Sequence, residues 1–97
     1  MHVVALRVEL RIRGARSLKE KRHTVKSVIS QLTATFRVAV AEVDDLDKWQ
    51  RATLGVAAVS GEAGHLTRMM HAIERWFHQR QDVEVLAIAA TPVEMVP

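Results

Sequence analysis

The chain has 97 residues, of which 48% are hydrophobic, and a formal net charge of +3. This length suits one packed domain spanning residues 1–97, and the lack of cysteine excludes disulfides, thiolate catalysis and cysteine-bound metals. No apolar run approaches the roughly 20 residues of a membrane span, and charged residues interrupt the N-terminal segment where a signal peptide would be apolar. We therefore expect a cytoplasmic protein with no membrane partner.

Charge is distributed unevenly along the chain. Residues 1–40 hold nine Lys and Arg against two acids, a balance of +7, whereas residues 41–97 hold five against nine, a balance of −4. This asymmetry predicts either a basic face for a polyanion or opposed faces that pair in an oligomer.

The first predicted element is a β-strand that ends at Gly14. From Val4 onward, apolar and charged residues alternate, and this period of two places the two sets on opposite faces of a strand. One face should join the core and the other should stay in water. The charged set is Arg7, Glu9, Arg11 and Arg13.

A capping box predicts the start of the first helix. The Ser17 hydroxyl can accept a hydrogen bond from the backbone N–H of Glu20, and the Glu20 carboxylate can reach back to the N–H of Ser17. Apolar residues then recur at helical spacing from Leu18 to Phe36. This pattern is typical of an amphipathic helix of about five turns.

Two valine-rich runs, residues 37–43 and 51–60, predict a pair of strands. The polar segment DDLDKWQ between them is typical of a loop, so we expect an antiparallel hairpin. A second amphipathic helix should follow Ser60 and Gly61, with Glu62 in its first turn, and a last strand should begin near Val83.

The order β-α-β-β-α-β, with right-handed crossovers, predicts an α+β fold of the ferredoxin-like type. Its four-stranded antiparallel sheet should carry both helices on one face.

Basic residues gather around the start of the first helix. Lys19, Arg22 and Lys26 fall at i, i+3 and i+7, so they share one side of it. Such a row could neutralise several phosphates of a nucleic acid, although charged rows are often only solvated surface. The candidate nucleic-acid-binding residues are Arg11, Arg13, Arg16, Lys19, Lys21, Arg22 and Lys26.

No motif for catalysis, a cofactor or a metal is present. The segment GARSLK lacks the second glycine and the Lys-Ser/Thr pair of a phosphate-binding loop. The helix N-terminus could still attract an anion, although Ser17 and Glu20 compete for its free N–H groups. His65, His71 and His78 lack the i, i+4 spacing of a zinc pair. We therefore expect a protein that is not an enzyme.

The loop before the third strand clusters carboxylates beside a tryptophan. The spacing of Asp44, Asp45 and Asp47 is not that of a calcium loop, and turn chemistry explains these aspartates equally well. Trp49 could present its flat face to a base or to a partner. A loop tryptophan more often closes the end of the core, and we expect that role here.

The predicted open face of the sheet lacks the aromatic residues on which an RNA-recognition motif stacks bases. Small residues should lie there instead, so the face could accept a second sheet. We therefore also expect a homo-oligomer that pairs through this face or through an edge strand. The small residues are Ala39, Ala41, Thr53, Gly55 and Ala57.

Three segments carry a family resemblance: SLKEKR at residues 17–22, AEV at 41–43 and WQRATLG at 49–55. Together with the order of elements, they make the whole chain resemble the YlxP-like family of small bacterial proteins, a domain of unknown function. The resemblance implies a ferredoxin-like fold and a cytoplasmic bacterial protein. Members commonly lie in gene neighbourhoods with translation-initiation and ribosome-binding factors, which implies a role near RNA or the ribosome. It implies no catalytic residues.

Two hypotheses for the function result. The first is a non-enzymatic RNA- or ribosome-associated factor that acts through the basic residues of the first helix. The alternative is a structural or regulatory homo-oligomer that associates through its sheet face or an edge strand.

Overall fold

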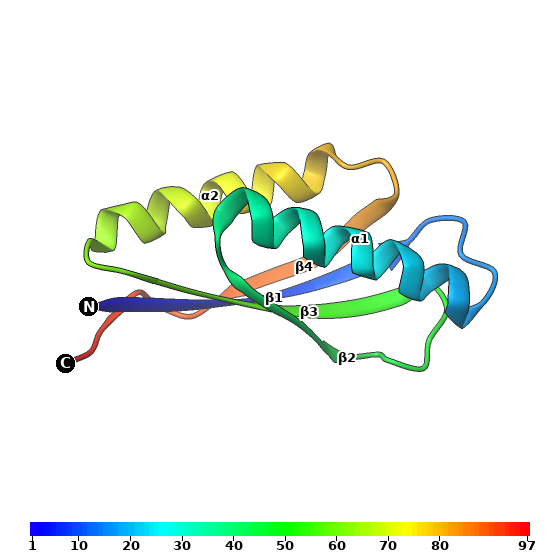
Figure 1. Ribbon diagram of the computed structural model, residues 1–97, viewed down its shortest axis with the longest axis horizontal. Helices are drawn as coiled ribbons and strands as arrows, with labels where there is room; N and C mark the ends of the chain where they lie inside the picture. The colour runs from blue at the N-terminus through cyan, green and yellow to red at the C-terminus, as the bar shows by residue number, and fades with distance from the viewer.

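Two helices pack on one face of an antiparallel sheet in the computed structural model, which describes residues 1–97 (Figure 1). The elements in chain order are β1 (His2–Ile12), α1 (Leu18–Phe36), β2 (Ala39–Asp44), β3 (Arg51–Ser60), α2 (Ala63–Gln79), β4 (Val83–Ala90) and the short β5 (Glu94–Met95).

The strand order across the sheet is β2-β3-β1-β4, and every neighbouring pair is antiparallel. The two β-α-β halves therefore interleave, and β1 and β3 occupy the centre. This is the arrangement of a ferredoxin-like fold, so the predicted fold class is confirmed. No helix is both long enough and apolar enough to cross a membrane.

The core lies between the sheet and the two helices. The alternating large apolar residues of β1 are buried, as the alternation predicted: Val4, Leu6, Val8, Leu10 and Ile12. They meet Leu32 of α1 and Phe77 of α2, neither of which has any exposed surface. Burying a side chain of this size contributes about 1.5–3 kcal/mol. The apolar stripes of both helices thus determine which face each turns to the sheet.

The capping box at the start of α1 is present, with one change of partner. The Ser17 hydroxyl accepts a hydrogen bond from the Glu20 N–H at 3.1 Å. The Glu20 carboxylate, however, accepts from the N–H of Arg16 at 2.5 Å, one residue earlier than the sequence suggested. The acidic side chain still binds a free backbone donor, so the helix start is fixed at both positions.

Arg37 ends α1, although the sequence placed it in the following strand. It adopts the left-handed conformation (φ 54°), and its N–H donates to the carbonyl of Thr33 at 2.8 Å. A left-handed residue is a common way to end a helix, because the returning N–H satisfies a carbonyl of the last turn. The strand therefore begins two residues later, at Ala39.

The two chain ends lie together at one end of the molecule (Figure 1). The short strand β5, which the sequence did not predict, pairs Met95 with His2 of β1, and the N–H of Val96 donates to the carbonyl of Met1 at 2.8 Å. The opposite end holds the start of α1 and the loop between β2 and β3 (Figure 1).

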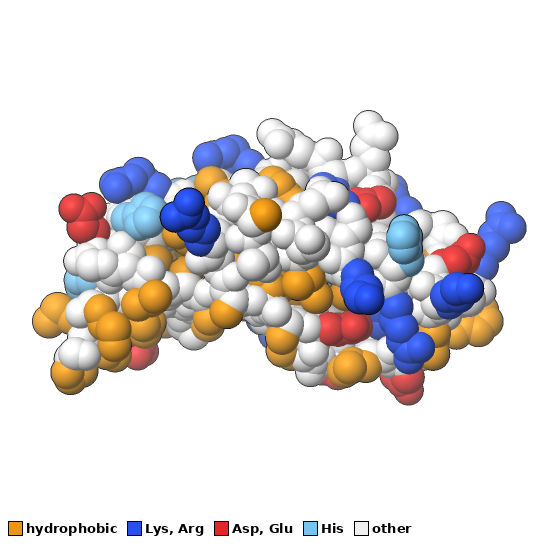
Figure 2. All heavy atoms as spheres, viewed as in Figure 1, with side chains coloured by type: hydrophobic (Ala, Val, Ile, Leu, Met, Phe, Trp, Pro, Cys, Tyr) orange, Lys and Arg blue, Asp and Glu red, His pale blue; other side chains and the backbone are white.

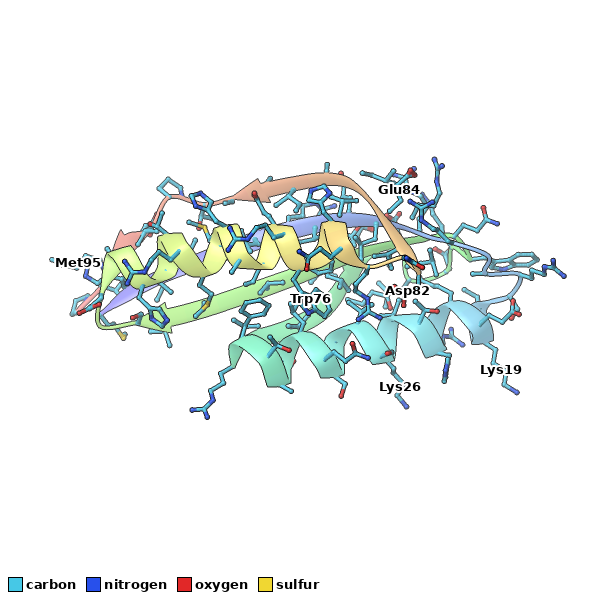
Figure 3. The ribbon with its side chains drawn as sticks, turned by 90° about the horizontal axis from the view of Figure 1, so that it is seen from above. Lys19, Lys26, Trp76, Asp82, Glu84 and Met95 are labelled. Carbon is cyan, nitrogen blue, oxygen red and sulfur yellow. The ribbon has the colours of Figure 1, made fainter.

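Arg80 links the two helices. Its guanidinium donates to the side-chain oxygen of Gln31 on α1 at 2.7 Å and lies 4.9 Å from the ring centroid of Trp76 on α2. It also forms an ion pair with Asp82 at 2.7 Å. Trp76 and Asp82 are labelled in Figure 3. The ring of Trp76 is in turn packed edge-on against Phe77 in the core.

Candidate functional site

Three segments meet at the end of the molecule where α1 begins. The N–H of Ile12 donates to the carbonyl of Gln50 at 2.8 Å, and the Gln50 side chain donates to the carbonyl of Ala15 at 3.3 Å. The N–H of Arg13 donates to the carbonyl of Asp82 at 3.0 Å. These bonds bring the turn after β1, the β2–β3 loop and the start of β4 into one surface.

The predicted row on α1 is exposed. Lys19, Arg22 and Lys26 all lie in solvent and take part in no ion pair. Figure 3 shows Lys19 and Lys26 pointing away from α2, on the outer flank of α1. The helical spacing places Arg22 between them on the same flank. The row is therefore free to meet a ligand.

Arg13 and Arg16 extend this surface around the helix start. Both side chains are exposed, and Arg13 donates from Nε to the carbonyl of Val83 at 3.4 Å. Arg13, Lys19 and His23 line an open groove of about 560 Å³. We call the exposed residues Arg13, Arg16, Lys19, Arg22 and Lys26 the basic surface. In the space-filling view, Lys and Arg side chains gather where α1 begins (Figure 2).

Arg11 lies on a different face from the row on α1. It points to the open side of the sheet, where it forms an ion pair with Glu84 at 3.3 Å and stands opposite Arg51 of β3. The residues proposed from the sequence as one patch are therefore divided between the helix layer and the sheet. Only the turn at Arg13 connects the two groups.

Lys21 is not part of the surface at all, so its assignment as a nucleic-acid-binding residue was wrong. Its side chain is fully buried beneath α1. The physical reason is helical geometry: Lys21 shares the buried flank with Val25, Val28 and Leu32, one turn before the apolar stripe. Charge alone suggested a solvent-facing residue, but its position on the helix points it inward.

The Lys21 ammonium has a complete set of partners. It donates to the carbonyls of Asp45 at 2.7 Å and Leu46 at 3.3 Å, and it lies 2.6 Å from Oε2 of Glu42. That carboxylate oxygen is buried and lacks hydrogen-bond geometry, so its contact with Lys21 is best described as an ion pair. Two hydrogen bonds and one ion pair together offset the cost of burying this ammonium.

A β-bulge in β2 separates the directions of Glu42 and Asp44. Glu42 stands opposite Leu54 and Asp44 opposite Thr53, so Val43 is an extra residue between them. Glu42 faces the helix layer, as Val40 does, by the ordinary alternation of the strand. The bulge turns Asp44 to the open side, where it forms an ion pair with Arg7 at 3.2 Å. The sequence pattern carried no signal for this bulge beyond the unusual run of acids.

Asp45 holds the loop that follows. It has a left-handed backbone (φ 59°), which aspartate tolerates better than most residues. Its carboxylate accepts from the Thr53 hydroxyl at 2.9 Å and pairs with Lys48 at 3.0 Å. Hydrogen bonds from Lys48 and from Thr53 both hold the pKa of Asp45 below its ordinary value, and the bond from Lys48 has the larger effect. Asp44 and Asp45 thus stabilise the turn of this loop through hydrogen bonds. No group of three or more His, Asp or Glu is placed to hold a metal ion.

Trp49 is exposed, so the expectation that it closes the core was wrong. The side chain is 55% accessible at the tip of the β2–β3 loop. The core at this end is already closed by Ile12 and Ala15, which are both buried. The neighbouring Leu46 is also 56% exposed.

The open face of the sheet forms a second feature. Ala5 of β1 pairs with Ala57 of β3, which pairs in turn with Ala39 of β2. These residues line an apolar groove of about 550 Å³, with Val3 and Val59 at its border. The small residues predicted for this face therefore lie together, except that Thr53 is buried beside Asp45. The groove lies toward the chain ends, away from the basic surface.

Replacing Lys21 tests the buried ion pair. Lys21→Met keeps most of the side-chain volume but leaves the carboxylate of Glu42 and two carbonyls without their donor. We expect a loss of about 3 kcal/mol in the free energy of unfolding, measured by urea denaturation. The double variant Lys21→Met/Glu42→Leu should recover much of it. Lys19→Met, on the exposed flank, should change stability by less than about 0.5 kcal/mol. An equally small effect at Lys21 would contradict the proposed role.

Thr53→Val tests the hydrogen bonding of Asp45. Since the folded-state pKa of Asp45 is lowered, this carboxylate contributes stability that is present above about pH 4 and is lost as the pH falls through its folded pKa. Loss of the hydroxyl should raise the pKa, as carbon-detected NMR titration would measure. It should also reduce the difference in stability between neutral and acidic pH. Thr67→Val on α2 is the control, and an unchanged Asp45 pKa in Thr53→Val would refute the assignment.

Comparison with known proteins gives a family but no activity. The chain is 43% identical over 49 residues to the uncharacterized protein YlxP of Bacillus subtilis (strain 168), and the match covers 50% of this chain and 53% of YlxP. The chain thus matches about half the length of that relative. A family model described as "Protein of unknown function (DUF503)" matches residues 3–90. The resemblance inferred from SLKEKR and WQRATLG is confirmed, and the chain belongs to the DUF503 family of proteins of unknown function.

Proposed function

We propose that this protein is a non-enzymatic, cytoplasmic factor that binds RNA, free or within the ribosome, through the basic surface. The observation that carries the proposal is the exposure of Arg13, Arg16, Lys19, Arg22 and Lys26 at one end of the molecule, with none of them in an ion pair. Unpaired cations on a fixed helix release counterions from a phosphate backbone when they bind it.

The dimensions of the row suit a polynucleotide. From Lys19 to Lys26, seven residues of helix span about 10 Å, so the row can contact more than one phosphate along a nucleic-acid backbone. Arg13 and Arg16 continue the row past the N-terminus of α1, where the helix dipole also favours negative charge.

Three acids near this surface are engaged by other cations. A fourth, Glu20, lies within it: its carboxylate accepts from the N–H of Arg16 and it lines the same groove as Lys19, so the five cations of the basic surface outnumber it. Glu42 is paired with Lys21 inside the protein at 2.6 Å, and Asp45 is paired with Lys48 at 3.0 Å. Asp44 is paired with Arg7 on the opposite face of the sheet at 3.2 Å. The gene neighbourhoods implied by the family resemblance, with translation-initiation and ribosome-binding factors, favour the same function.

Charge reversal tests this proposal with a matched control. Lys19→Glu/Lys26→Glu should weaken binding to purified ribosomal subunits and to structured RNA. The slope of the logarithm of the association constant against the logarithm of the salt concentration should also become smaller, by about 0.7–0.9 for each lost phosphate contact. Arg68→Glu/Arg75→Glu changes the same charge at the same spacing on exposed positions of α2. This control should bind nearly as the wild type does. Equal losses in both variants, or no binding at low salt, would refute the proposal.

Self-association through the open sheet face is a second candidate. It is favoured by the groove whose floor is formed by Ala5, Ala39 and Ala57, and the long side chains of Arg37 and Glu94 also line this groove. Apolar residues at the adjacent end of the sheet remain exposed, with Val59 at 61% and Met95 at 78%. A dimer formed here would leave the basic surface of each copy free, so the two candidates are compatible.

Ala57→Arg tests self-association, since it places a charged side chain in the centre of the groove. We expect light scattering to show an oligomer for the wild type at micromolar concentration and a monomer for the variant. Ala34→Arg, on the exposed side of α1, should leave the assembly unchanged. A monomeric wild type would exclude this candidate.

A further inference from the structure

Trp49 is an aromatic side chain held in solvent by an ordered loop. The N–H of Lys48 donates to the carbonyl of Asp45 at 3.1 Å, and on the other side Gln50 is bonded through both its carbonyl and its side chain. Both neighbours of Trp49 are thus fixed, while 55% of its side chain is accessible. An indole left this exposed is unusual, because its large apolar surface normally becomes buried.

The buried ammonium of Lys21 fixes this loop from beneath. Lys21 binds the carbonyls of Asp45 and Leu46, which lie four and three residues before Trp49. The loop is therefore ordered before any ligand arrives, and a ligand that stacks on the ring does not have to order the loop itself. Pre-organisation of this kind lowers the entropic cost of binding.

Cationic side chains surround the loop tip. Arg11 of β1 stands opposite Arg51 of β3, and Ile12 is bonded to Gln50. Arg13 and Trp49 are the next residues in sequence beyond this bonded pair, so Trp49 belongs to the loop that is bonded to the segment where the basic surface begins. Arg11 is paired with Glu84 and Lys48 with Asp45, whereas Arg13 and Arg51 form no ion pair. An aromatic ring near such unpaired cations matches the needs of a single-stranded polynucleotide, whose bases stack while its phosphates are neutralised.

A protein partner fits this arrangement less well. The centre of a protein interface is typically a cluster of apolar anchors from which charge is depleted. Here Leu46 is the one other large apolar side chain exposed on the loop, and charged residues Asp47, Lys48 and Arg51 separate the tip from other apolar surface. A duplex is disfavoured too, because its base faces are already stacked.

We propose that Trp49 stacks on an unpaired base of single-stranded RNA whose backbone lies on Arg13, Arg16 and Lys19. This inference rests on the proposed RNA-binding function and assigns it a ligand class: single-stranded or looped RNA, with little dependence on base identity.

The test compares variants in binding to a fluorescein-labelled oligouridylate of about twelve nucleotides and to a blunt RNA duplex of the same length. Trp49→Ala should weaken oligouridylate binding about tenfold, with an unchanged salt slope, since stacking releases no counterion. Trp49→Phe, which keeps an aromatic face, should recover part of the affinity. Leu46→Ala removes the neighbouring exposed apolar side chain and should have no effect. The duplex should bind more weakly than the single strand and should not respond to Trp49→Ala.

The outcomes separate this inference from the function on which it rests. If Lys19→Glu/Lys26→Glu loses binding while Trp49→Ala binds as the wild type does, the RNA function survives and the stacking site is refuted. If the wild type binds neither RNA at low salt, both are refuted. If Trp49→Ala leaves RNA binding intact but abolishes capture of a protein from nuclease-treated lysate, Trp49 belongs to a protein interface and the inference fails.

Discussion

The buried ion pair between Lys21 and Glu42 is the interaction on which the α1 end of the molecule depends. It joins the first turns of α1 to β2, and the same ammonium also binds the carbonyls of Asp45 and Leu46. An ammonium can remain in the interior only when its donors are matched, so the helix, the bulged strand and the loop must adopt their positions together. The positions of Asp45 and Leu46 at the start of the loop follow from this constraint.

The folded structure separates cations that are adjacent in the sequence. Lys21 is used inside the protein, while Arg7 and Arg11 pair with acids on the open side of the sheet. Lys19 and Arg22, the nearest neighbours of Lys21 among the basic residues, remain exposed. The excess positive charge of the N-terminal half therefore concentrates at one end of the molecule rather than covering a whole face.

The two candidate surfaces lie apart for a related reason. Along the open face, the sheet changes from charged residues near the α1 end to alanines near the chain ends, so an electrostatic surface and an apolar groove occupy opposite ends. Gly55 sits between them, where a Cβ atom would come within 3.0 Å of Cγ1 of Val43. Val43 is the extra residue of the bulge that follows Glu42, so this distortion of β2 lies against Gly55 on the open face, next to the interior ion pair.

The sequence by itself determined the element order, the core face of β1 and the cap at Ser17, because these depend on periodicity and on contacts a few residues apart. It also identified the exposed row of Lys19, Arg22 and Lys26, since helical spacing fixes which residues share a flank. Only the tertiary structure decided the burial of Lys21, the division of Arg11 from the row, and the exposure of Trp49. Each of these depends on what a residue meets across the fold: Glu42, two loop carbonyls, Glu84, and a core already closed by Ile12 and Ala15. Local patterns cannot specify such partners, because the residues that meet are brought together only when the sheet pairs and the helices pack on it.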